Sequence, residues 1–344
     1  MNKTGSSAFT EDVSVGDGYR KKYFSSLEDL INVEKEAKEA ERNAFFTPEK
    51  VMKNREGYVK KLKELIGYPL FDRKNGAFFK KIRLGEDDDC EIYRYEFFFE
   101  KGIVSYGLFF VPLCAFGKLP LVVCVHGGEG TPELMSGMYG SNHYSDIVRR
   151  FVRKGCCVFA PALMVWNTSD LGKKYSRSDM DARMKALGSS MTSFECELIR
   201  GETELISGED AVDGSRRGVA GLSYGAYYSM FLAALETDFK AAYVSGIVND
   251  RLKFVRPDFL YTGQAGYMLD HEICGLICPR ALYVEAGRHD AFFDWRTAKS
   301  EAEKTSRFYS ECGYASKFVF SLTEEGHKYS PYDDGIDFVL SHLE

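Results

Sequence analysis

The segment from Val219 to Leu235 constrains the fold more than any other part of this chain, because a Gly-x-Ser-x-Gly turn joins an apolar strand to an apolar helix. The strand pattern runs into Gly221, Ser223 follows two residues later, and the helix pattern begins directly afterwards. A turn this tight has no room for a Cβ atom at Gly221 or Gly225, while it holds the Ser223 hydroxyl exposed above the sheet. Three such residues at this spacing arise easily by chance, so the flanking strand and helix carry the prediction.

Length and charge narrow the class of protein and of partner. The chain has 344 residues and a formal net charge of −6, with acidic and basic residues mixed throughout. A chain of this length can bury a large core within one main domain. The sequence shows no basic patch typical of nucleic-acid or membrane binding, and no apolar run near the ~20 residues of a membrane span. We therefore expect a small-molecule substrate as the partner, without nucleic acid or membrane, and the oligomeric state stays open.

The amino terminus and the cysteines indicate the cellular compartment in which we expect the protein. Met1 to Ser7 contain no apolar stretch of the kind that directs export. The nine cysteines lie mostly in apolar, strand-like settings, as at Cys124 and Cys156. Such cysteines are typical of reduced, buried thiols, so we expect a cytoplasmic protein. No second Cys or His pair follows Cys274 and Cys278 at zinc spacing, so we expect no metal.

The pattern along the chain divides into two regions. From Leu27 to Leu65 the sequence has helical spacing and is rich in Glu, Lys, Ala and Leu. Thr47 and Pro48 interrupt it as an N-cap and a first helical residue. Residues 1–85 are therefore predicted to be a helical extension packed on the core, and residues 86–344 to be the main domain.

The main domain alternates apolar strands with helical segments, which indicates an α/β fold with a mostly parallel sheet covered by helices on both faces. Two aromatic and β-branched stretches precede this pattern and predict an antiparallel hairpin at the N-terminal edge of the sheet, for eight strands in all. The predicted strands are Cys90–Phe99, Ile103–Val111, Leu119–Val125, Cys156–Ala160, Arg217–Leu222, Ala241–Ser245, Ala281–Glu285 and Lys317–Ser321. The predicted helices are Tyr144–Lys154, Met180–Ile206, Ser223–Glu236, Thr297–Cys312 and Asp334–Leu343.

A serine nucleophile needs a base and a carboxylate that orients the base, and after a turn of this kind the chain order is Ser, acid, His. His327 follows the last predicted strand through a polar loop that returns toward Ser223. Asp290 lies just beyond the carboxyl end of the strand predicted at 281–285, where a carboxylate would face the base. Asp294 and Glu285 remain alternatives for the acid.

Acyl transfer also needs N–H donors for a developing oxyanion. One donor is expected from Tyr224, the residue after the serine, and the other from a loop after an earlier strand. His126-Gly127-Gly128 follows the strand predicted at 119–125, and its glycines let backbone N–H groups face a pocket. The second donor is therefore predicted to be Gly127 or Gly128.

These motifs together resemble the α/β-hydrolase superfamily, in its dienelactone hydrolase and acetyl xylan esterase-like branch. The resemblance spans about Glu91 to the C-terminus and includes Gly221 to Gly225, Cys278 to Gly287 and Gly326-His327. It implies an α/β-hydrolase catalytic domain over residues 86–344, with Ser223 as nucleophile, His327 as general base and then acid, and Asp290 as its orienter. Ser223 stands where dienelactone hydrolases proper carry a cysteine, so the resemblance does not imply that particular reaction.

Two long connections, 161–180 and 249–272, leave carboxyl ends of strands, where sheets of this class bind ligands. Trp166, Tyr261 and Tyr267 lie in them and are predicted to form an apolar or sugar-stacking wall of the substrate pocket, with core packing as the alternative. Arg183 and Glu195 would be paired, structural ions if buried, and a solvated helix face if exposed.

The sequence thus predicts a serine hydrolase that cleaves carboxylic esters through an acyl-enzyme, with a short acyl group on a carbohydrate or another polar alcohol. No cofactor is expected. One alternative is a peptidase of the prolyl oligopeptidase kind, although the chain lacks the repeating β-blades that precede that domain. The other is a binding protein without activity, since fold does not determine function.

Overall fold

A nine-stranded sheet organises the computed structural model of the protein, which describes residues 9–113, 117–140, 142–164 and 176–343. The strand order is β1-β2-β3-β5-β4-β6-β7-β8-β9. The first three strands are antiparallel to their neighbours, and β4 to β9 run parallel to one another. The strands are β1 (Phe78–Glu86), β2 (Cys90–Phe99), β3 (Ile103–Pro112), β4 (Leu119–Val125), β5 (Cys157–Pro161), β6 (Val212–Leu222), β7 (Phe239–Ser245), β8 (Ala281–Gly287) and β9 (Phe318–Thr323).

Helices cover both faces of the sheet, which confirms the predicted α/β architecture. Successive side chains of a strand point to opposite faces, and in β4 Val123 packs in one apolar cluster while Val122 and Cys124 pack in the other. The first cluster includes residues of α3 (Arg55–Ile66), α7 (Met191–Ile206), α8 (Tyr224–Leu235), α9 (Asp270–Ile277) and α10 (Trp295–Glu311). The second includes residues of α4 (Pro132–Met135), α5 (Ile147–Arg153) and α11 (Asp334–Leu340).

The sheet has one strand more than the eight predicted. The extra strand, β1, pairs antiparallel with β2, so the predicted hairpin of β2 and β3 does not form the edge of the sheet. Lys80, Lys81 and Arg83 break the apolar alternation of β1, and most of its side chains are exposed. An exposed edge strand carries little hydrophobic pattern, which explains why the sequence did not reveal it. The predicted boundary at residue 85 falls within this strand.

The helix predicted over Met180–Ile206 is two helices, α6 (Arg177–Ala186) and α7. Gly188 adopts a left-handed conformation with φ of 78°, which ends the helical path. The Ser190 side chain then accepts a hydrogen bond from the Ser193 N–H and caps α7. The 249–272 connection likewise contains the start of α9, which was not predicted.

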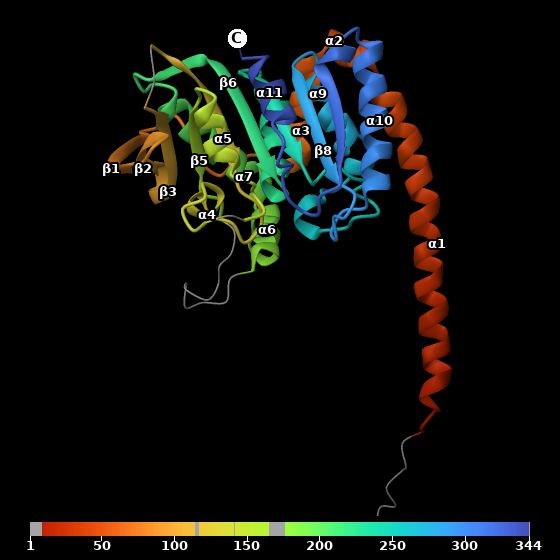
Figure 1. The fold of residues 1–344 in the computed structure, drawn as a ribbon. Coiled ribbons are helices and arrows are strands. Elements are labelled where there is room, and N and C mark those ends of the chain that lie inside the picture. The colour runs from red at the N-terminus through yellow and green to blue at the C-terminus, as the bar shows by residue number, and fades with distance from the viewer. Residues whose placement is uncertain (1–8, 114–116, 141, 165–175, 344) are drawn as a thin grey trace, which may run out of the picture.

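The N-terminal region is helical as predicted, but its first helix is longer. It contains α1 (Val13–Phe45), α2 (Pro48–Lys53) and α3, and Thr47 caps α2 ahead of Pro48. The C-terminal end of α1 lies against the body of the protein, and the remainder extends away from it (Figure 1). Neither α1 nor any other helix of the described chain combines the length and the apolar character needed to cross a bilayer.

Candidate active site

The turn between β6 and α8 has the strained geometry that the sequence predicts. Ser223 adopts φ of 59° and ψ of −121°, which is rare for a residue with a side chain. A Cβ at Gly221 would overlap the backbone of Gly225, and a Cβ at Gly225 would overlap the carbonyl of Val125. These contacts confirm the steric reason for both glycines. The turn places Ser223 just beyond the carboxyl end of β6, at the start of α8.

Asp290 and His327 lie in contact, although 37 residues separate them in the chain. His327 Nδ1 is 2.7 Å from Asp290 Oδ2. The other carboxylate oxygen, Oδ1, accepts hydrogen bonds from the backbone N–H groups of Phe292 and Phe293. The Asp290 side chain is only 2% exposed, so these three contacts hold the carboxylate in one orientation toward the imidazole.

Backbone pairing between two loops brings these side chains together. The N–H groups of Arg288 and His289, directly after β8, donate to the carbonyls of Thr323, the last residue of β9, and Glu325, two residues before His327. A Cβ at Gly287 would overlap the Glu325 carbonyl, so this close approach requires a glycine. The two loops thus act as one unit at the edge of the sheet.

The two alternative acids have other partners. The Asp294 side chain accepts a hydrogen bond from the Arg296 N–H and caps α10. Glu285 is 3% exposed and accepts hydrogen bonds from the Tyr243 and Ser245 hydroxyls and the Ser330 N–H. Burial raises the pKa of Glu285. In the described structure only Asp290, of the three predicted acids, contacts His327.

Ser223 and His327 line the same cavity, which has a volume of about 270 Å³. The other lining residues are Gly127, Gly128, Glu129, His143, Leu222, Tyr224, Ile247, Arg256, Phe259, Phe292 and Phe293. The rings of Phe292 and Phe293 also contact the His327 ring, with centroids 4.9 and 5.6 Å away. Among the described residues, no group of three or more His, Cys, Asp or Glu side chains is arranged to hold a metal ion.

The loop after β4 also lines the cavity. A hydrogen bond in this loop distinguishes Gly127 from Gly128, the two residues predicted as the second oxyanion donor. The Gly127 N–H donates to the buried Tyr144 hydroxyl at 2.9 Å, and Gly128 lines the cavity beside it. Tyr224 begins α8, where backbone N–H groups point out of the helix N-terminus.

His126 holds this loop in place as a neutral side chain. Its Nε2 accepts a hydrogen bond from the Leu163 N–H, and its Nδ1 contacts the Gly127 carbonyl, so the proton lies on Nδ1. Burial lowers the pKa of His126 to about 4. The ring therefore ties the glycine loop to the chain beyond β5 without a charge.

A buried group of ions lies behind Tyr224. Glu195 is fully buried, as the alternative of a buried structural ion required. Its partner is Arg177, at 2.8 Å. Arg183 is exposed, as the other alternative required, so Arg183 and Glu195 do not form the pair that burial of both would have given. Arg177 also contacts Asp258 at 3.0 Å, and the same carboxylate oxygen accepts the Tyr224 hydroxyl. Arg177 is the first residue of α6, and sequence spacing alone offered no sign of its partners.

The predicted aromatic wall is wrong for the two tyrosines that the structure describes. The Tyr261 hydroxyl bonds to those of Tyr227 and Thr192, and Tyr267 packs on Phe45, so neither lines the cavity among the described residues. Trp166 lies outside the described residues. The 249–272 connection does reach the cavity, but through Arg256 and Phe259.

Solved structures share this fold at low sequence identity. A candidate acetyl xylan esterase from Bacteroides fragilis is 17% identical, with a TM-score of 0.64 over 80% of this chain and 76% of that one. A glucuronoyl esterase from Solibacter usitatus is 11% identical, with a TM-score of 0.66 over 84% of this chain and 92% of that one. Acetyl xylan esterase 1 from Thermoanaerobacterium sp. is 14% identical, with a TM-score of 0.53 over 84% and 92%.

No family model matches the sequence, and no curated protein is similar to it in sequence. The similarity is therefore one of fold, and it agrees with the strand order and with the strained turn at Ser223. The chain has the α/β-hydrolase fold.

Proposed function

We propose that the protein is a serine hydrolase that cleaves carboxylic esters through an acyl-enzyme, with Ser223, His327 and Asp290 as its triad. The observation that carries this proposal is the contact of Asp290 with His327 Nδ1 at the cavity that also contains Ser223. Since His327 Nδ1 faces the Asp290 carboxylate, His327 Nε2 is the nitrogen assigned to accept the Ser223 proton and later to donate it. The esterases that share the fold support the same class of reaction.

The steps follow from this arrangement. The Ser223 oxygen bonds to the ester carbonyl carbon as its proton passes to His327. The bond to the alcohol oxygen then breaks, and the alcohol leaves with that proton. Water attacks the acyl-enzyme by the same route and releases the acid and free Ser223. Asp290 orients the imidazole and stabilises its protonated form.

The oxyanion of each tetrahedral intermediate is assigned to the backbone N–H groups of Tyr224 and Gly128. The Gly127 N–H donates to the Tyr144 hydroxyl, which supports Gly128 rather than Gly127 as the donor to the oxyanion. Tyr224 contributes from the helix N-terminus, where the dipole also favours negative charge. The buried ions behind Tyr224, centred on Arg177, hold its side chain and so position this end of α8.

The cavity favours a small acyl group on a polar alcohol. Its volume of about 270 Å³ lies below that of sites for drug-sized ligands. Phe259, Phe292 and Phe293 offer an apolar surface near the serine, while Arg256 and Glu129 offer polar contacts. Two of the similar structures carry acetyl xylan esterase in their names, which supports an acetyl group on a carbohydrate as the first substrate to test.

The test is hydrolysis of p-nitrophenyl esters of increasing acyl length, followed by acetylated xylo-oligosaccharides. We expect the highest kcat/KM on acetate, and a loss of about 10³-fold or more in Ser223→Ala. Ser316→Ala is the matched control, because Ser316 is exposed and lies in a turn before β9, so full activity is expected.

A fluorophosphonate should label Ser223 in the wild type and leave Ser223→Ala unlabelled. Full activity of Ser223→Ala, or labelling at another residue, would overturn the proposal. A wild type that neither hydrolyses any ester nor reacts with the probe would favour a binding role.

A further inference from the structure

A buried carboxyl lies close to the candidate active site and takes no part in the steps described above. Glu285 is in β8 and is 3% exposed. Its Oε1 accepts hydrogen bonds from the Ser245 hydroxyl at 2.9 Å and from the Ser330 N–H at 3.1 Å. Its Oε2 accepts one from the Tyr243 hydroxyl at 2.8 Å. Glu285 is not among the described residues that line the cavity, so any effect on the reaction passes through other residues.

The cost of burying this carboxyl makes its three hydrogen bonds strongly constraining. Removing a carboxyl from water is unfavourable unless donors within the protein replace the lost hydration. Burial raises the pKa of Glu285, which reflects that cost. A donor that moved away would leave a polar atom buried without its partner. The carboxyl therefore holds three segments of the chain at fixed distances from one another: β7, β8 and the segment after His327.

The end of β7 positions the nucleophile. The Ser245 carbonyl accepts a hydrogen bond from the Ser223 N–H at 2.9 Å, while the Ser245 hydroxyl donates to Glu285. The next residue, Gly246, donates its N–H to the Glu285 carbonyl at 2.9 Å. A Cβ on Gly246 would lie 3.3 Å from Nδ1 and Cε1 of the His327 ring. Residues 245 and 246 thus lie against both Ser223 and His327, and Glu285 fixes them from the side of β8.

The segment after His327 positions the base. The Ser330 N–H, three residues after His327, donates to Glu285. The Ser330 carbonyl accepts a hydrogen bond from Arg150 at 2.8 Å, so this residue is held through both of its backbone polar groups. The His327 ring contacts Asp290, five residues beyond Glu285 in the chain. The backbone after the base and the carboxylate that orients it are therefore both held relative to β8.

We propose that Glu285 is a positioning residue of the active site, whose buried carboxyl fixes the separation of Ser223 and His327 by joining the end of β7 to the segment after the base. This inference rests on the proposed function, since it takes Ser223 and His327 as nucleophile and base. Proton transfer between them requires a hydrogen-bond separation, and a displacement of about 1 Å can slow catalysis about 100-fold. A carboxyl with only a structural role would change the stability of the fold and leave kcat of the folded protein unchanged.

Two substitutions of similar length separate these roles. In Glu285→Gln, the amide oxygen can still accept from Ser245 and Ser330, and the amide NH₂ can donate to the Tyr243 hydroxyl oxygen. Glu285→Met fills the same space without a strong acceptor. With p-nitrophenyl acetate as substrate, we expect Glu285→Gln to keep kcat within about threefold of the wild type. We expect Glu285→Met to lower kcat by about 10- to 100-fold, with KM changed by less than about twofold.

Glu202→Met is the matched control. Glu202 in α7 is also fully buried, and its carboxyl accepts a hydrogen bond from Ser105 of β3. Neither residue is among the described residues that line the cavity. The control should keep kcat within about twofold of the wild type, whatever its melting temperature. A fall in kcat equal to that of Glu285→Met would show that loss of any buried carboxyl slows the enzyme, and would overturn the inference.

Hydrogen–deuterium exchange tests the positioning without any substrate. Glu285→Met should speed exchange of the amides at 328–330, which include the Ser330 N–H, by about tenfold or more. Glu285→Gln and Glu202→Met should leave this exchange within about twofold of the wild type. If the wild type hydrolyses no ester, the proposed function is refuted, while faster exchange in Glu285→Met still supports the link from Glu285 to the segment of His327.

Two results with Glu285→Met would overturn the inference: an unchanged kcat, or unchanged exchange at 328–330. Equal losses of kcat in Glu285→Gln and Glu285→Met would also overturn it. If Glu285→Met does not fold, Ser245→Ala removes one donor to the carboxyl and keeps the backbone carbonyl that receives the Ser223 N–H. We expect Ser245→Ala to lower kcat by about threefold or more with KM little changed, and an unchanged kcat there would be equally decisive against the inference.

Discussion

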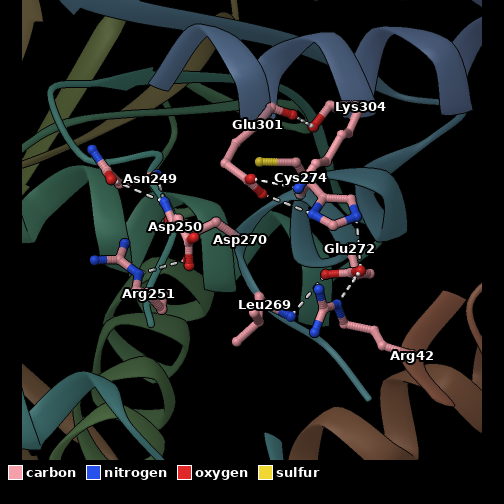
Figure 2. Close-up of polar contacts among 12 residues, drawn as sticks. Arg42, Asn249, Asp250, Arg251, Leu269, Asp270, Glu272, Cys274, Glu301 and Lys304 are labelled. Carbon is pink, nitrogen blue, oxygen red and sulfur yellow. Dashed lines mark hydrogen bonds and ion pairs between the residues drawn. The ribbon is translucent and has the colours of Figure 1, made fainter. Parts of the chain in front are cut away.

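His271 joins three helices and should make the stability of the protein depend on pH. It lies in α9, with Nε2 at 2.7 Å from Glu272 and Nδ1 at 2.8 Å from Glu301 of α10. Glu272 also pairs with Arg42 of α1, and Glu301 with Lys304 (Figure 2). Since each ring nitrogen faces a carboxylate, each must donate a proton, and only the imidazolium can donate both.

The size of the effect follows from the shifted pKa values. Burial opposes the charge on His271, but Glu272 and Glu301 outweigh it and raise its pKa from 6.5 to about 9. Because folding raises the pKa of His271, the imidazolium stabilises the folded protein fully at a pH below 6.5, its ordinary pKa. This stabilisation is lost as the pH rises through about 9. The shift corresponds to about 3 kcal/mol. Glu301 has its pKa lowered to about 2, chiefly by His271 against the effect of burial, so its contribution is lost only in strong acid.

The assay is urea unfolding at pH 6.0, 7.5 and 9.5 for the wild type and His271→Asn. We expect the wild type to exceed the variant by about 3 kcal/mol at pH 6.0 and by less than about 1 kcal/mol at pH 9.5. His289→Asn is the control, because its side chain is 72% exposed and its removal should change stability little at any pH. A difference between wild type and His271→Asn that stays constant across the three pH values would refute the reasoning.

Three further variants test the site. Asp290→Asn should lower kcat by about 10³-fold or more. Asp294→Ala, which removes only a helix cap, should keep kcat and lose about 1 kcal/mol of unfolding free energy; equal kcat losses would contradict the assignment. Gly225→Ala should destabilise the fold by more than about 3 kcal/mol in thermal unfolding, because its Cβ overlaps the Val125 carbonyl, and a native-like melting curve would be inconsistent with this contact. Arg256→Gln should raise KM for acetylated sugars by about tenfold in steady-state kinetics, with kcat little changed. An unchanged KM would show that Arg256 does not bind the substrate.

Short-range sterics made the serine turn predictable. Gly221, Ser223 and Gly225 lie within five residues, and the flanking apolar segments show the strand and the helix directly. The cap at Thr47 and Pro48 was predictable for the same reason. The strand β1 was not, since Lys80 and Lys81 on an exposed edge carry no apolar pattern.

Contacts between distant segments decided the rest of the site. Sequence order limited the acid to three residues, and only the pairing of the loops after β8 and β9 shows that Asp290, not Asp294 or Glu285, meets His327. Likewise, only the tertiary structure shows that the Gly127 N–H is taken by a tyrosine hydroxyl.

What the sequence by itself determined is therefore the α/β class, the strained turn, and the residue types available for the chemistry in chain order. These depend on backbone sterics and on hydrophobic periodicity, which act over a few residues. The tertiary structure alone decided which carboxylate faces His327, which arginine meets Glu195, and which aromatic side chains line the cavity. Those choices depend on the relative placement of loops and helices, and packing between segments far apart in the chain sets that placement.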